Sequence, residues 1–157
     1  MKFVLPFIGK TKSSYLEAGI QEYTHRLSRF GKVELLLLRD KSERKEPEEK
    51  TKLRDAEQLL TAIEPYRKKI VVALDSKGKS VDSETLATTL TSWQDRGFET
   101  CCLLIGGHLG LHPTVVQKAD MVLSLSRLTF THEMTRLILL EQLYRACTIQ
   151  AGHKYHK

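Results

Sequence analysis

The sequence predicts an α/β fold: a mostly parallel sheet with helices on both faces. Strand-like apolar runs alternate with amphipathic helical segments along the 157 residues, which is the order that successive parallel βα units produce. One run, 100–105, has no polar alternation, and such a strand is covered on both faces. A chain of this length suits one domain, 1–157, with no internal boundary.

The first three elements follow from apolar periodicity and from turn residues. A strand is expected over 3–8. A helix over 15–29 carries an apolar stripe, and Ser14 with Glu17 predicts a capping box at its start. A second strand covers 33–38, so that these elements form a βαβ unit.

The middle of the chain continues the same alternation. The segment 41–52 mixes both charge signs, which indicates an exposed loop running into a solvated helix, with an RNA-binding arm as the alternative. A third strand over 69–74 is expected to end at Asp75 and a glycine turn. The triplet at 78–80, Gly-Lys-Ser, is read as a plain turn because the earlier glycine of a P-loop is absent. Asp82 then caps a third helix.

Three glycines directly follow the buried run at 100–105 and indicate a ligand pocket. Gly106, Gly107 and Gly110 permit positive φ and let a ligand touch the main chain. Ligands of open α/β sheets bind outside the carboxyl ends of the strands, so position and composition agree. The alternative is a tight strand-to-helix turn without a ligand. The spacing matches neither the dinucleotide fingerprint nor a P-loop.

The carboxyl-terminal part consists of one more strand and a long helix. A strand over 120–125 leads through the polar loop 126–130 into a helix that Thr131 caps. The apolar residues 137–140 wrap more than one turn of this helix, which indicates burial between two bodies. The second body is either the rest of the same domain or a second copy of the chain.

Two polar pairs interrupt this last helix. His132 and Arg136 share one face, and Glu141 and Arg145 share another, where a plain salt bridge is the alternative to a functional role. The tail at 152–157 is rich in aromatic, imidazole and cationic groups. Such a tail either binds RNA or frays.

Composition narrows the class of protein. The net charge of +6 favours a polyanionic partner such as nucleic acid. Three cysteines without a C-x-x-C spacing indicate buried, reduced thiols. No stretch approaches the ~20 apolar residues of a membrane-spanning helix, and the amino terminus lacks a secretory pattern. We therefore expect a cytoplasmic protein without membrane contact.

Two pairs of histidines are weak candidates for a metal-binding site. His108 with His112, and His153 with His156, have possible ligand spacing. Neither pair is accompanied by a cysteine or carboxylate cluster, so we expect no metal site.

Four motifs in one order resemble the RlmH family of SPOUT methyltransferases. They lie at 103–111, 124–136, 141–146 and 155–157, and read LLIGG-x-x-GL, SLS-x-LTF-x-H-x-x-x-R, EQLYRA and YHK. The resemblance extends over the whole chain. Members commonly have proline at two positions, where this chain has Lys154 and Glu133.

The resemblance implies a SPOUT fold with a carboxyl-terminal trefoil knot and methylation of N3 of a pseudouridine in 23S rRNA. S-adenosylmethionine would be the methyl donor, and 23S rRNA or the ribosome the partner. The apolar last helix and the tail together predict a homodimer, whose active site combines the knot of one subunit with the carboxyl terminus of the other. The predicted cofactor-binding residues are Leu74, Gly106, Gly107, Gly110, Leu125, Ser126, Arg127, Leu128, Thr129 and Phe130.

The predicted catalytic residues follow from the chemistry of this reaction. Methyl transfer to a ring nitrogen needs alignment and loss of the N3 proton. His132, Tyr155 and His156 are candidates for assisting that loss. Arg136 or Arg145 would stabilise the developing uracil anion or hold phosphate. The alternatives are helix capping for His132, RNA contact for His156, and a non-catalytic basic module that binds rRNA.

Overall fold

The computed structural model describes residues 1–41 and 46–156, with His156 described through its backbone only. Its centre is a five-stranded sheet of order β2-β1-β4-β3-β5, in which all four neighbouring pairs are parallel. The predicted fold class is therefore confirmed. The strands are β1 (Lys2–Ile8), β2 (Val33–Leu38), β3 (Lys69–Ser80), β4 (Thr100–Leu104) and β5 (Met121–Ser124).

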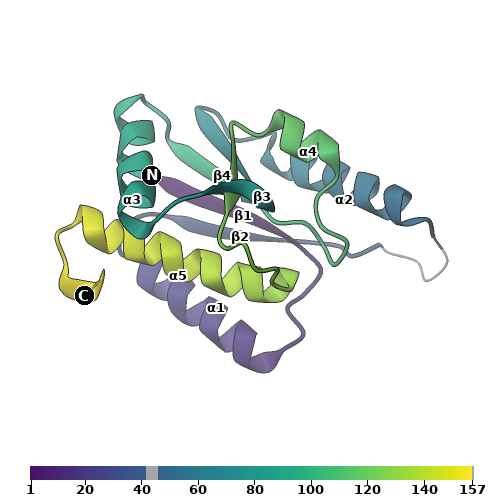
Figure 1. Ribbon diagram of the computed structural model, residues 1–157, viewed down its shortest axis with the longest axis horizontal. Coiled ribbons are helices and arrows are strands. Elements are labelled where there is room, and N and C mark those ends of the chain that lie inside the picture. The colour runs from purple at the N-terminus through teal and green to yellow at the C-terminus, as the bar shows by residue number, and fades with distance from the viewer. Residues whose placement is uncertain (42–45, 157) are drawn as a thin grey trace.

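Helices cover both faces of the sheet (Figure 1). On one face α5 packs against both α1 and α3, and on the other α2 packs with α4. A short 3-10 turn, Lys154–His156, follows α5. Part of the predicted charged segment 41–52, namely 42–45, lies outside the described residues. The helices are α1 (Ser14–Leu27), α2 (Glu48–Ile63), α3 (Ser83–Asp95), α4 (Pro113–Lys118) and α5 (His132–Gln150).

The central strand β4 explains why its sequence lacks polar alternation. Side chains of a strand alternate between faces. Cys101 and Leu103 enter the core beneath α1, α3 and α5, while Cys102 and Leu104 enter the core beneath α2 and α4. Both sets are buried, so every position of the strand is apolar or small. All three cysteines are buried and free, as expected.

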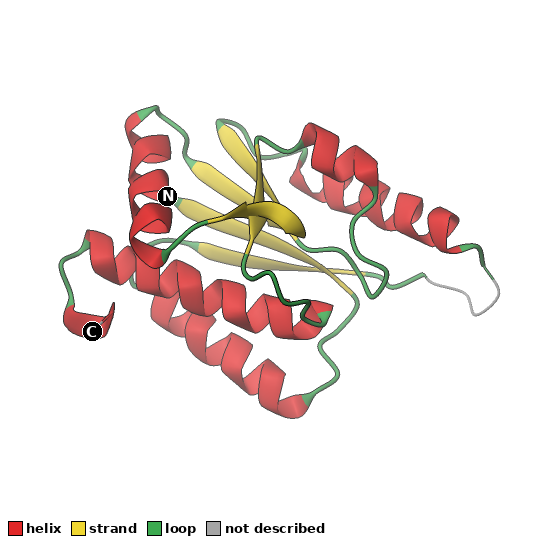
Figure 2. Cartoon of the chain, viewed as in Figure 1, coloured by secondary structure: helices red, strands yellow, loops and turns green. Residues whose placement is uncertain are grey.

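Strand β3 is longer than predicted. It continues past residue 74, shifts register, and pairs again with β5, where Lys79 lies beside Leu123. Gly78 is inside this extension, and a Cβ there would lie 2.7 Å from the carbonyl oxygen of Val122. The prediction of a plain turn at 78–80 was therefore wrong: this glycine serves a close crossing of two backbones. The crossing is visible in Figure 2, where the end of β3 arches over the other strands.

The start of α1 also differs from the prediction. The helix begins at Ser14, its N-cap is Ser13, and no side chain caps it. The expected capping box with Glu17 is absent. Instead the Glu133 carboxylate in α5 accepts the backbone N–H of Lys12 at 3.0 Å and that of Ser13 at 3.2 Å. The carboxylate that binds the start of α1 thus comes from a residue 120 positions away in the sequence.

A second polar contact joins α5 to the end of β1. The Arg136 guanidinium donates to the carbonyl oxygen of Ile8 at 2.6 Å and to the Thr11 hydroxyl at 3.0 Å. It also lies over the Phe7 ring, 4.5 Å from the ring centroid. Arg136 is 1% exposed, and its buried side chain connects α5 to the end of β1 and to the β1–α1 loop.

Helix α5 is only partly buried within the described chain. Leu139 and Leu140 are fully buried, whereas Leu137 and Ile138 remain half-buried. The domain therefore accounts for one side of the predicted apolar helix. Within residues 1–41 and 46–156, no helix has the length and apolar character needed to span a membrane.

Glu133 provides a test of these contacts. Burial opposes ionisation of its carboxyl, but the N–H groups of Lys12 and Ser13, together with the nearby His132 and Arg136, lower the pKa of Glu133 overall. Charged hydrogen bonds of this kind contribute ~1.5–3 kcal/mol. We expect Glu133→Gln to reduce the free energy of unfolding by about that amount at neutral pH, measured by urea denaturation.

The pH dependence and a control sharpen this prediction. Because the folded pKa is lowered, the contribution is present above the unfolded pKa of ~4.3 and disappears as pH falls through the folded value. The difference between the two proteins should therefore shrink in acid. Glu17→Gln, at a half-buried position in the first turn of α1 where the carboxylate accepts from Gln21 and not from Lys12 or Ser13, should change stability by less than ~0.5 kcal/mol. A larger effect at Glu17 than at Glu133 would contradict a stabilising role for the hydrogen bonds between Glu133 and the N–H groups of Lys12 and Ser13.

Candidate active site

A pocket of about 840 Å³ lies at the carboxyl ends of β3, β4 and β5. Residues 74–76 of β3, the glycine loop at 105–111 and the loop at 125–131 form three of its walls. The beginnings of α1 and α5 close the fourth side, and Tyr15 and His132 belong to this wall. Its size is that of a small-molecule site, at the edge of the sheet where such sites occur in open α/β folds.

The pocket contains nine of the ten residues predicted to bind a cofactor. Arg127 is the exception: it is exposed and lies between two lining residues, Ser126 and Leu128. Sequence reasoning missed several further lining residues. Asp75 and Ser76 directly follow the predicted end of β3 at residue 74, so the carboxyl-edge rule could have found them. The lining residues that the sequence predicted are Leu74, Gly106, Gly107, Gly110, Leu125, Ser126, Leu128, Thr129 and Phe130.

Glycine is required at 106 and at 110 of this loop for two different structural reasons. A Cβ at Gly106 would lie 2.3 Å from the carbonyl carbon of Gly110, so Gly106 lets the loop close on itself. The N–H of Gly110 donates to the carbonyl of Gly107 at 3.0 Å and holds this closure. Gly110 has a φ of +82° and open space where its Cβ would be. The loop is thus a rigid wall that presents main chain to the pocket.

A buried carboxyl stands directly behind this loop. Asp55 of α2 is 4% exposed, and its Oδ2 lies 2.8 Å from where a Cβ of Gly107 would be. Its Oδ1 has no hydrogen-bond partner among the described residues. Burial, and then the nearby Asp40, raises the pKa of Asp55, against the opposing cation of Arg54. The sequence offered no signal for this residue beyond its place on a helix.

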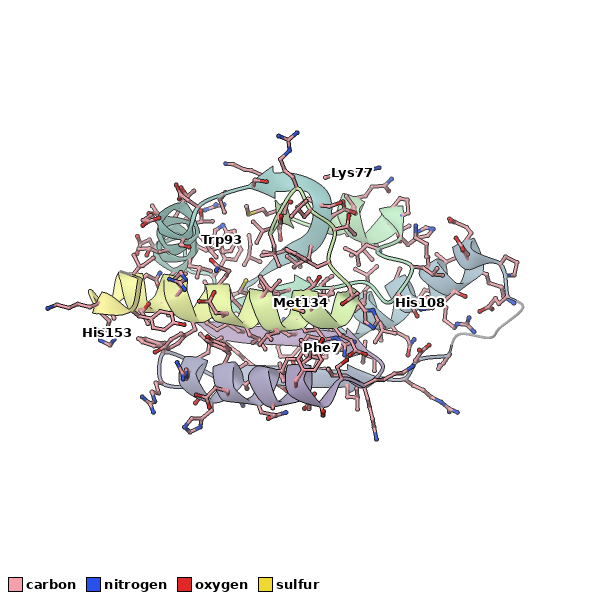
Figure 3. The ribbon with its side chains drawn as sticks, turned by 60° about the horizontal axis from the view of Figure 1, so that its bottom comes forward. Phe7, Lys77, Trp93, His108, Met134 and His153 are labelled. Carbon is pink, nitrogen blue, oxygen red and sulfur yellow. The ribbon has the colours of Figure 1, made fainter. Side chains whose placement is uncertain are left out.

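His132 is the titratable group best placed in the pocket. It is the first residue of α5 and is half-buried. Burial, followed by the positive charge of Arg136, lowers the pKa of His132 below its usual 6.5. His108 of the glycine loop lies beside this end of α5 (Figure 3) and lowers it further. The ring is therefore neutral at pH 7 and able to accept a proton.

Arg136 lies beneath the pocket and does not line it. Its guanidinium is occupied by Ile8 and Thr11, and burial lowers its pKa. The structure thus places this residue behind the wall that carries His132.

The other catalytic candidates lie at the far end of α5. Thirteen residues separate His132 from Arg145, which corresponds to ~20 Å of helix. The Arg145 guanidinium binds Glu141, with Nε at 3.1 Å from Oε1, so the predicted pair is confirmed. The Tyr155 hydroxyl donates to the same Oε1 at 3.3 Å and lies 3.2 Å from the Tyr23 hydroxyl.

The candidates therefore form two groups, one at each end of α5. The tail turns back beside the carboxyl end of the helix, and Figure 3 shows His153 and His108 at opposite ends of it. The side chain of His156 lies outside the described residues. A single copy of the chain does not bring Arg145 and Tyr155 to the pocket.

The histidine pairs show no metal-binding arrangement in the described part of the chain. No group of three or more suitable side chains occurs there. His112 instead caps α4 by accepting the N–H of Thr114 at 3.2 Å, and its Nε2 lies 2.8 Å from Glu49.

Comparisons with known proteins agree with this geometry. A family model described as predicted SPOUT methyltransferase matches residues 1–156. The ribosomal RNA large subunit methyltransferase H of Desulfotalea psychrophila is 46% identical over 160 residues, covering 100% of both chains. The protein of that name from Symbiobacterium thermophilum is 41% identical over 161 residues, again covering 100% of both.

Solved structures share the fold at low identity. A probable methylase family protein from Haemophilus influenzae superposes with a TM-score of 0.56 at 13% identity, covering 99% of this chain and 70% of its own. A probable methyltransferase from Bordetella pertussis gives 0.55 at 12%, covering 93% and 95%. At these identities the likeness concerns the fold alone. The full-length match to the family, together with the pocket at the carboxyl edge of its sheet, establishes that the chain belongs to the SPOUT methyltransferases.

Proposed function

We propose that this protein transfers a methyl group from S-adenosylmethionine to large-subunit ribosomal RNA, at N3 of a pseudouridine. The observation that carries the proposal is the pocket itself, in which nine residues expected to bind the cofactor converge. Full-length relatives named ribosomal RNA large subunit methyltransferase H support the substrate class. The net charge of +6 suits an RNA partner.

The chemistry of the pocket fits S-adenosylmethionine. Leu74, Ile105, Leu125 and Phe130 supply apolar surface for an adenine ring. The glycine loop supplies peptide groups that can hydrogen-bond to its edge and to the ribose. When bound, S-adenosylmethionine supplies a methyl group on a positively charged sulfur, a good electrophile for a ring nitrogen.

The protein's part in the reaction is alignment and removal of one proton. N3 carries hydrogen before the reaction, so a methyl group at N3 requires that this proton leave. His132 is neutral, lines the pocket and accepts the proton as the new N–C bond forms. Glu133 and Arg136 position His132 by fixing the first turns of α5 against the end of β1.

The distribution of polar groups along α5 supports a homodimer with composite sites. Arg145 is ~20 Å along the helix from His132, and Tyr155 binds Glu141 near that same end, so both act at the pocket of a second copy. The half-buried Leu137 and Ile138 offer apolar surface to that copy. The tail is folded against the carboxyl end of its own helix, where the Tyr155 hydroxyl donates to Glu141, so Tyr155 meets the second copy together with Arg145. We further propose that the trefoil knot is located at the crossing of β3 and β5.

A matched pair of glycine variants tests the cofactor pocket. Gly110 and Gly97 have almost equal φ values, +82° and +85°, and open space at the Cβ position, but only Gly110 lines the pocket. Alanine should cost each site ~1–2 kcal/mol of stability. We expect Gly110→Ala to weaken S-adenosylmethionine binding about tenfold or more by calorimetry, and Gly97→Ala to leave it unchanged. Equal affinities would place the cofactor elsewhere, and wild-type protein that binds none would favour a non-catalytic rRNA-binding module.

The lowered pKa of His132 predicts how kcat depends on pH. Because its pKa is lowered from 6.5, the acid limb of kcat should fall below that value, with a plateau by about pH 7. His132→Gln should reduce kcat roughly 10²- to 10⁴-fold and remove the limb, while cofactor affinity is retained. An unchanged profile in the variant would exclude His132 as the base.

A complementation experiment tests the composite site. Deletion of 153–157 should abolish methylation and preserve dimers and cofactor binding. Gly106→Val should destroy the pocket, because its side chain would meet the Gly110 backbone. In an equal mixture after subunit exchange, half of the dimers are mixed and contain one intact site, so activity should recover to about a quarter of wild type. Verified mixed dimers without activity, or a monomeric wild type in sedimentation, would contradict the sharing of sites.

A further inference from the structure

Tyr15 is an exposed aromatic side chain on the rim of the pocket. It is 69% exposed, and among large apolar side chains of the described residues only Leu128, at 73%, exceeds it. Both residues line the pocket, from α1 and from the loop after β5. Neither the ring nor the hydroxyl of Tyr15 contacts a described partner through a hydrogen bond, an ion pair or ring stacking. An aromatic surface is thus left open beside the pocket.

The backbone that carries Tyr15 is held firmly. Tyr15 is the second residue of α1, and the two residues before that helix, Lys12 and Ser13, donate their N–H groups to Glu133. Glu133 directly follows His132 in α5. The starts of α1 and α5 lie at the same end of the molecule (Figure 1), so one carboxylate fixes Tyr15 relative to His132. A rigid backbone of this kind is what a recognition side chain needs.

The charges around Tyr15 point to nucleic acid. Lys10 and Lys12 precede it, both exposed and without an ion pair among the described residues. Lys12 also lines the pocket. A stacking ring flanked by free cations is the combination by which proteins hold unpaired nucleotides, because the ring covers a base and the cations reach its phosphates. A second copy of this basic chain would be a poorer match for these lysines than a polyanion.

The reaction itself requires such a surface. N3 lies on the Watson–Crick edge of a pyrimidine, so the target base must leave any pair and stack before its N3 can face a methyl donor. Bases removed from a stack are commonly covered by aromatic side chains. We propose that Tyr15 is the stacking platform for the target pyrimidine, with Lys10 and Lys12 holding the adjoining phosphates. This inference rests on the proposed function and adds the residues that recognise its RNA substrate.

Kinetics of three variants test this role. Tyr15→Leu removes the π-face and keeps an apolar side chain, whereas Tyr15→Phe and Tyr15→Trp keep an aromatic ring. With unmethylated ribosomes as substrate and saturating cofactor, Tyr15→Leu should lower kcat/KM roughly 5- to 100-fold, the range of one base stacking interaction. The phenylalanine and tryptophan variants should stay within a few-fold of wild type. Cofactor affinity, measured by calorimetry, should not change in any of them.

Leu37→Ala is the matched surface control. Leu37 is 58% exposed on β2 and does not line the pocket, so its kcat/KM should equal that of wild type. A normal kcat/KM in Tyr15→Leu would overturn the proposal. Loss of cofactor binding would overturn it too, by making Tyr15 part of the cofactor site, and so would a changed oligomeric state, by making it an interface residue.

Fluorescence gives a readout that does not depend on methylation. The only tryptophan, Trp93, is buried in the core, so Tyr15→Trp adds one exposed emitter. An RNA hairpin with one unpaired loop uridine should quench this emitter more than the same hairpin with an abasic site there. Equal emission with both would contradict stacking. If wild-type protein methylates no RNA but the two hairpins quench the emitter to different extents, the proposed reaction is contradicted and the proposed stacking site is supported.

Discussion

The contact between α5 and the β1–α1 loop is the interaction on which the site depends. Glu133 binds two backbone N–H groups before α1, and Arg136, one turn later, binds the end of β1. Both side chains are buried, so their charges would be costly without these partners. The two contacts set the position of His132 in the pocket wall and bring α1 beside it. One short stretch of α5 therefore supports the catalytic candidate and the rim at Tyr15.

Close approach of backbones is the second constraint. Gly78 lets β3 cross β5, and Gly106 lets the loop after β4 fold against Gly110. In each place a Cβ would lie well inside van der Waals distance of main-chain atoms, which cannot move aside as a flexible side chain can. The glycines therefore shape the pocket by packing the protein against itself. Gly107 differs, because the atom nearest to its Cβ position belongs to a side chain, the buried carboxyl of Asp55.

The separation of polar groups along α5 is the feature of the fold on which the proposed homodimer rests. A helix of nineteen residues is rigid, so the pair of Arg145 and Glu141 cannot approach His132 of the same chain. At the carboxyl end, Glu141 accepts from both Arg145 and Tyr155, which holds the tail against its own helix. A second copy of the chain that met α5 would find this cluster already formed.

The sequence by itself determined the order of strands and helices along the chain, the parallel sheet, the caps at Asp82 and Thr131, and nine residues of the pocket lining. These features depend on local signals: apolar period, a hydroxyl or carboxylate before a helix, and glycines after a buried strand. Tertiary structure decided the length of β3, the contact of Glu133 with the residues before α1, and the burial of Arg136. In each case the deciding partner lies far away in the sequence, over 40 residues for the β3–β5 crossing and over 100 for the two contacts of α5, so no local pattern could name it.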